Sequence, residues 1–186
     1  AGQLHADRDV CKGSTDTPRG ATPGTTETPE PPSFSEGSMS VFMEECIFCQ
    51  IANGKRDAEI IYSDEKVIAF MDHRPIGTGH ILVLPREHYR DVFEIPDDIL
   101  CRVSVIAKKL SIALKRTFNP PGINLIENNG TDAGQTIFHF HIHIIPRYDS
   151  RYNNELAKVA WGRKVVSPDL LRETREKIQK NLEIEK

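Results

Sequence analysis

Three histidines occupy alternate positions in one short segment of the chain: His139, His141 and His143. Alternate side chains on a β-strand share a face, so the segment predicts three imidazoles on one side and the intervening apolar residues in a core. Imidazole packs no better at such positions than Val or Thr. We therefore interpret the row as a chemical site, because imidazole serves as a nucleophile, a general base and a metal ligand.

The spacing of these histidines limits how a metal ion could use them. With a rise of about 3.3 Å per residue, the Cα atoms of the outer two lie roughly 13 Å apart on a straight strand. Zinc needs each nitrogen at about 2.0 to 2.1 Å, so one strand supplies two of these ligands and hardly three. At least one histidine of the row is therefore expected to have another task.

Cys46 and Cys49 form a C-x-x-C motif. Thiolates at this spacing hold structural zinc or form a redox pair, and the redox pair belongs in a thioredoxin-like βαβ unit that this sequence does not indicate. We predict a structural zinc site, which needs two further ligands. The candidates for these ligands are His73, His80, His88 and one histidine of the row.

A loop rich in Asn and Gly, residues 128–136, directly precedes the histidine row. Small residues let backbone N–H groups turn toward a bound anion. Gln135 and Thr136 add side-chain donors beside the histidines. The loop is therefore predicted to cradle a phosphate group.

The elements that must position these residues are those of an α+β domain. Apolar runs bounded by turn residues predict the strands, and apolar residues at three- and four-residue spacing predict the long helix. The predicted strands are 60–62, 67–71, 80–84, 123–127 and 137–146, and the predicted helices are 49–53, 96–118 and 168–182, the last one starting at the N-cap Ser167. Connections this short favour antiparallel pairing, with the helices gathered on one side.

Composition divides the 186-residue chain into three parts. Residues 1–43 are expected to be a disordered tail or a segment left from cloning, because their many Gly, Pro, Ser and Thr residues offer little apolar surface to offset the entropy of ordering. Residues 44–147 form the domain that carries the site. Residues 148–186 form a C-terminal extension that contains the last helix.

The charge pattern argues against two classes of partner. The net charge is −3 and the 24 Lys and Arg residues are scattered, which does not fit the basic surface of a nucleic-acid binder. No apolar run is long enough to span a membrane, and no secretory signal is recognisable. We expect a cytoplasmic protein that binds neither nucleic acid nor a membrane.

The residues around the histidine row form a known pattern. The histidine-triad (HIT) family of nucleotide hydrolases and transferases is marked by His-x-His-x-His followed by apolar residues, and this chain resembles it over residues 134–145. The resemblance extends from Cys46 to Arg147 and includes the segments 70–72 and 79–88. With its cysteines, the chain is most similar to the zinc-carrying, Hint-type branch.

This resemblance implies a fold, an activity and a cofactor. The fold is an antiparallel five-stranded sheet with a long helix and a short N-terminal helix, usually paired into a homodimer whose sheets join. The activity is hydrolysis at the α-phosphate of purine nucleotide derivatives, of the adenosine 5'-phosphoramidate type, through a covalent nucleotidyl-histidine. The cofactor is structural zinc, and no catalytic metal is expected.

The resemblance also implies a role for each residue of the site. The catalytic group is His141 as the nucleophile, with His143, His80 and Thr136 at the phosphate and the leaving group. The substrate-binding residues are Asp72 at the ribose, Asn128 and Gln135 at the phosphate, and Ile47 and Phe48 at the base. The implied zinc ligands are Cys46, Cys49, His88 and His139.

Two features depart from the family pattern and leave alternatives open. Thr136 stands where serine is frequent, and the extension with Trp161 differs from the short tail of the phosphoramidase branch. Hydrolysis of dinucleoside polyphosphates and nucleotidyl transfer are therefore alternative activities. A nucleotide-binding scaffold without turnover is the alternative from another class.

Overall fold

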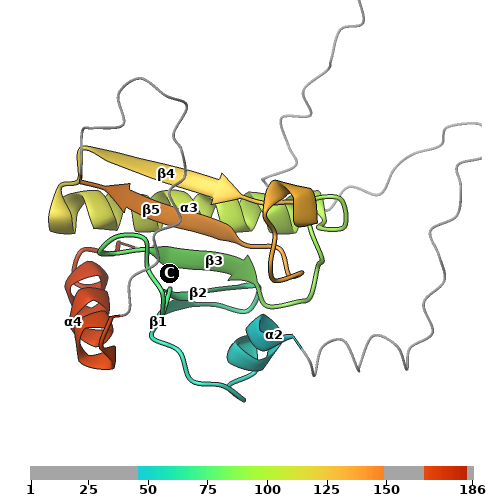
Figure 1. Cartoon of the computed structure of the whole chain (residues 1–186), viewed down its shortest axis with the longest axis horizontal. Helices are drawn as coiled ribbons and strands as arrows, with labels where there is room; N and C mark the ends of the chain where they lie inside the picture. Colours follow the sequence, from blue (N-terminus) through green and yellow to red (C-terminus); the bar gives the residue numbers. More distant parts are fainter. Residues whose placement is uncertain (1–45, 149–165, 184–186) are drawn as a thin grey trace, which may run out of the picture.

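The computed structural model describes residues 46–148 and 166–183 (Figure 1). The tail at 1–43 and Trp161 lie outside the described residues. Within the two described ranges, no helix is both long and apolar enough to cross a membrane.

A five-stranded antiparallel sheet forms the centre of the molecule (Figure 1). Its strands are β1 (Ile60–Ser63), β2 (Val67–Met71), β3 (Ile81–Pro85), β4 (Gly122–Glu127) and β5 (Ile142–Arg147). Their order in the sheet is β1-β2-β3-β5-β4, and each neighbouring pair runs antiparallel. The predicted α+β class and five-stranded antiparallel sheet are confirmed.

The last strand begins five residues later than predicted, at Ile142. His143 is therefore the one histidine of the row that lies in β5, while His139 and His141 precede it. Strand pairing between β3 and β5 ends at Val83 and Ile142. Two residues further along β3, the carbonyl of Pro85 accepts a hydrogen bond from the His139 side chain, 2.9 Å away, and not from a backbone N–H of the segment before β5. The residues that precede Ile142 therefore lie outside the sheet.

The long helix α3 (Asp97–Phe118) covers one face of the sheet. Its apolar stripe lies in one core with β1, β2, β3 and β5, and the helix ends at Asn119, which adopts the left-handed conformation of a C-cap. Helix α4 (Pro168–Gln179) joins the same core through Ile178, which has no exposed surface. The Ser167 side chain caps α4 by accepting from the backbone N–H of Leu170.

The short helix α2 (Ile47–Ala52) lies on the opposite face. It packs against Ile68 and Phe70 of β2 and against Leu82 and Leu84 of β3. The prediction that all helices gather on one side is therefore wrong. All five residues of β2 are buried, so both of its faces require cover, and a single helix layer covers only one of them.

Candidate active site and metal centre

A cavity of about 330 Å³ lies on the α2 face of the sheet. One end is apolar and is lined by Ile47, Phe48, Ile51, Phe70, Leu82 and Ile137. The other end is polar and is lined by Asp72, His73, Asn128, Gly134, Thr136, His141 and His143. The cavity therefore offers a dry wall for a flat ring system next to a cluster of donors and acceptors.

The middle histidine of the row, His141, lines this cavity and has only 7% of its surface exposed. Its Nδ1 lies 2.6 Å from the carbonyl oxygen of His139, and a carbonyl can only accept, so Nδ1 carries the proton and Nε2 the free electron pair. Burial lowers the pKa of His141, because the imidazolium form would lose its hydration. The side chain is thus a neutral imidazole with a free nitrogen, as a nucleophile requires.

His143 is backed by a second buried histidine. His80 has 1% exposure, does not line the cavity, and places its Nε2 2.9 Å from Nδ1 of His143. Two groups approach Nδ1 of His80: Oδ2 of Asp72 at 3.4 Å and the backbone N–H of Ile76 at 3.3 Å. Because the N–H can only donate, Nδ1 accepts from it. We therefore assign the proton of His80 to its Nε2, which donates it to Nδ1 of His143 in a hydrogen bond. Since Nδ1 of His143 accepts, the proton of His143 lies on its own Nε2.

The loop before the histidine row is braced from behind by Gln135, which is buried. Its Oε1 accepts from the backbone N–H of Gly130 at 2.8 Å, and its Nε2 donates to the carbonyl of Arg90 at 2.7 Å. Asn128 and Thr136 line the cavity, whereas Gln135 does not. The Gln135 side chain therefore links the loop to the backbone of Arg90, and its contact with phosphate stays a prediction.

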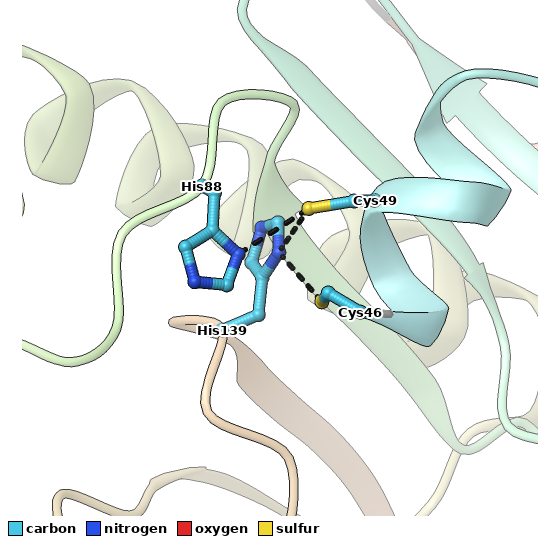
Figure 2. Close-up of side chains that lie close together, drawn as sticks. All are labelled: Cys46, Cys49, His88 and His139. Atoms are coloured by element: carbon cyan, nitrogen blue, oxygen red, sulfur yellow. Dashed lines mark hydrogen bonds between the residues drawn. The ribbon is translucent and has the colours of Figure 1, made fainter. Parts of the chain in front are cut away.

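Two cysteines and two histidines converge beside this cavity (Figure 2). Cys46 is the N-cap of α2 and Cys49 lies in that helix, while His88 comes from the segment after β3 and His139 from the segment before β5. Nδ1 of His139 lies 3.5 Å from Cys46 Sγ and 3.4 Å from Cys49 Sγ, and Nδ1 of His88 lies 3.3 Å from Cys49 Sγ. In a tetrahedral zinc site the S···N separation is about 3.5 Å, so this donor set fits the ion.

The surroundings of the cluster prepare its donors for a metal. Nε2 of His139 donates to the carbonyl of Pro85 at 2.9 Å, which leaves Nδ1 unprotonated and facing the thiols. The contact between the two thiols lowers the pKa of Cys46, with help from hydrogen bonds to His139 and His88, and the same contact together with burial raises the pKa of Cys49. A thiolate at Cys46 and an unprotonated Nδ1 at His139 are ligand forms that zinc binds.

The structure thus divides the predicted residues between two sites. Among the candidate third and fourth ligands, His88 and His139 join the cysteines, whereas His73 lies at the cavity and His80 behind His143. Sequence reasoning considered His73 only as a zinc ligand, and it did not assign four apolar residues to the cavity: Ile51, Phe70, Leu82 and Ile137. The alternation of β2 and β3, which puts Phe70 and Leu82 on one face, is the signal that could have found two of them.

Comparison with known proteins gives matches along the same residues. The HIT domain family matches residues 53–150, more than half of the chain. A HIT-like protein of Methanocaldococcus jannaschii is 41% identical over 69% of this chain and 97% of its own length. An adenosine 5'-monophosphoramidase of Candida albicans is 33% identical over 74% of this chain and 91% of its own length.

A solved structure shares the fold and contains zinc. The zinc-bound histidine triad family protein of Mycobacterium smegmatis has a TM-score of 0.63 and 30% sequence identity, over 75% of this chain and 94% of that one. That protein was crystallised with bound zinc, the ion that the cluster of Cys46, Cys49, His88 and His139 fits.

Proposed function

This chain belongs to the HIT family, and on that premise we propose that it is a hydrolase that cleaves the α-phosphate bond of purine nucleotide derivatives of the adenosine 5'-phosphoramidate type. The observation that carries the proposal is the state of His141. Its imidazole is buried and neutral, lines the cavity, and keeps the electron pair of Nε2 free. The similarity to a monophosphoramidase supports the choice of substrate type.

The two ends of the cavity suggest how the nucleotide lies. The base packs on the apolar wall that includes Phe48 and Leu82. The ribose lies near Asp72, whose carboxylate accepts from its hydroxyl groups. The α-phosphate then meets His141 and His143, with Asn128, Thr136 and the backbone of the loop as further donors.

The proposed reaction has two steps. First, the electron pair on Nε2 of His141 forms an N–P bond with the α-phosphorus while the bond from phosphorus to the leaving amine breaks. The amine takes up a proton from solvent and leaves as ammonia. The proton on Nε2 of His143 stabilises the developing charge on the phosphate oxygens, and His80 acts through His143 by fixing its tautomer. Second, water attacks the phosphorus, gives up a proton to solvent, and releases the nucleoside monophosphate and the free imidazole.

Rates on three substrates test this proposal against its alternatives. We expect adenosine 5'-phosphoramidate to be hydrolysed faster than a diadenosine polyphosphate, and faster than nucleotidyl transfer from a nucleotide sugar. Rapid quenching in alkaline denaturant followed by mass spectrometry should reveal nucleotide bound to the peptide that contains His141, because an N–P bond to imidazole survives in alkali and hydrolyses in acid. Tight nucleotide binding with neither turnover nor a trapped adduct would instead identify a scaffold.

We also propose that the cysteine and histidine cluster holds zinc with a structural role. Its four protein donors fill a tetrahedral shell and leave no position open for substrate, as in structural sites. The reduced, purified protein should contain about one zinc per chain, and Cys49→Ser should lower both the metal content and the unfolding midpoint. Zinc-free reduced protein together with a Cys49→Ser variant as stable as the parent would reject this role.

Finally, we propose that two copies pair through β4, one of the two edges of the sheet. At the other edge, Gln179 of α4 donates its Nε2 to the carbonyl of Ile61 in β1 at 3.0 Å, which obstructs strand addition there. On β4, Leu125 is 53% exposed. Sedimentation analysis should give a dimer, which Leu125→Glu weakens; a monomer at all concentrations would contradict the pairing.

A further inference from the structure

Helix α2 serves the metal cluster and the cavity at once. Cys46 and Cys49 point to His88 and His139 (Figure 2), while Ile47 and Phe48, the two residues between the cysteines, line the apolar end of the cavity. A metal ion that binds both sulfur atoms would therefore also fix the position of Ile47 and Phe48 in the cavity wall.

The two ends of α2 are held differently. The C-terminal end is tied down by Arg86, which donates to the carbonyl of Ala52, and by the Asn53 side chain, which donates to the carbonyl of Cys49 at 2.9 Å. Among the described residues, which begin at Cys46, no side chain caps the N-terminal end, and its first turn contains no acidic residue. A helix of six residues is not stable by itself, so the first turn depends on its side-chain contacts and on the sulfur donors.

The polar end of the cavity has a separate frame. His143 lies in β5, and its partner His80 accepts at its backbone carbonyl from the N–H of Asp72 at 3.0 Å. His139, which orients His141 through its carbonyl, has its own bond to Pro85 besides the contacts with sulfur. His143, His80 and Asp72 are therefore fastened to the sheet and not to α2. Among the polar groups, His141 also contacts α2, because its ring packs edge-on against Phe48 with the ring centroids 5.0 Å apart.

We propose that ligation of Cys46 and Cys49 controls recognition of the base, by fixing the first turn of α2 and with it Ile47 and Phe48. The metal centre is thereby a determinant of nucleotide affinity in addition to stability. The inference rests on the proposed function for the kind of ligand that enters the cavity. It predicts a loss of affinity that depends on the base and spares the sugar phosphate.

Calorimetric titration of the reduced protein with AMP and with ribose 5-phosphate, before and after zinc is removed by a chelator, tests the inference. Contact between a base and an aromatic wall contributes about 1–3 kcal/mol, so removal of zinc should weaken AMP binding about tenfold to a hundredfold. The dissociation constant of ribose 5-phosphate should change less than about twofold on the same reasoning. Readdition of zinc should restore the affinity for AMP.

Equal weakening of both ligands, or no weakening of either, overturns the inference. Continued binding of ribose 5-phosphate also shows that the zinc-free chain is still folded. If the zinc-free chain unfolds, the same pair of titrations is made on Cys46→Ala, which removes the sulfur donor at the N-cap of α2 and leaves Cys49, His88 and His139 in place. A base-dependent loss in this variant supports the inference, and its absence rejects it.

A matched control separates this effect from general loss of stability. Ile178→Ala removes a buried side chain of α4 from the core on the other face, without touching the cavity or the cluster. It should lower the unfolding midpoint and leave the ratio of the two dissociation constants unchanged. If the zinc-loaded parent binds no AMP, the proposed nucleotide site fails as well; if it binds AMP equally with and without zinc, only the present inference fails.

Discussion

The two faces of the sheet are covered in different ways. On one face the 22-residue helix α3 buries six apolar side chains, and α4 adds Ile178. On the other face the six-residue helix α2 buries Phe48, Ile51 and Ala52, together with Cys49, and the rest is cavity, loop and metal cluster.

This difference separates stability from chemistry. Burial of apolar side chains is non-directional and suits the face that holds the fold together. The α2 face instead arranges groups that bond in fixed directions, such as the His141 imidazole and the thiols of Cys46 and Cys49. Substitutions on the two faces should therefore change different measured quantities.

The largest effect is expected from His141→Ala. Loss of the attacking nitrogen should lower turnover by about three orders of magnitude or more. The unfolding midpoint should change little, since the side chain lies at the cavity and not in the α3 core. A variant that keeps at least a tenth of the parent's hydrolysis of adenosine 5'-phosphoramidate would show that His141 is not the nucleophile.

Two identical truncations compare the faces directly. Leu110→Ala in α3, at 0% exposure, should cost about 2–5 kcal/mol in the free energy of unfolding and leave kcat/KM unchanged while the protein is folded. Leu82→Ala, which lines the cavity, should in addition raise KM. Urea unfolding and steady-state kinetics measure both variants, and equal kinetic effects would abolish the distinction between the faces.

A smaller effect concerns Asp64, which ties the turn between β1 and β2 to α3. Burial raises the pKa of this carboxyl, but hydrogen bonds from Tyr62, Arg102, Val67 and Lys66 outweigh burial and lower the pKa to about 2, from its usual 3.8. The stabilisation is therefore present above pH 3.8 and is lost as the pH falls toward 2.

Asp64→Asn should accordingly cost about 1–2 kcal/mol at pH 7. The difference from the parent should shrink as both proteins are unfolded in urea at pH 4, 3 and 2. A difference in the free energy of unfolding that stays constant over this range would mean that the charge of Asp64 does not stabilise the contact between the turn and α3.

The smallest effect is a shift in the pH dependence of turnover. Since burial lowers the pKa of His141 from its usual 6.5, the neutral imidazole persists into more acidic solution. The acid limb of kcat/KM should have its midpoint below pH 6.5, measured with the zinc content checked at each pH. A midpoint at or above 6.5 would contradict the buried, neutral nucleophile.

Local patterns predicted most elements well. The spacing of Val103, Ile106, Leu110 and Leu114 gave the long helix, and β2 has the predicted bounds of 67–71. The start of β5 was missed, because the alternation of the histidines continues before Ile142 while the backbone leaves the sheet there. Strand periodicity reports which residues could share a face and not whether a neighbouring strand is present to pair with them.

By itself, the sequence determined the kinds of chemistry available: two thiols at C-x-x-C spacing, a row of imidazoles and a loop of small polar residues. Tertiary structure alone decided that His139 joins Cys46, 93 positions away, and that His141 turns to the cavity. The physical reason is that such contacts depend on the order of the strands and on where the chain leaves the sheet. Strand order and the end of the sheet depend on packing across the whole domain. The spacing of residues along the chain determines only whether a segment forms a helix or a strand and which of its side chains share a face.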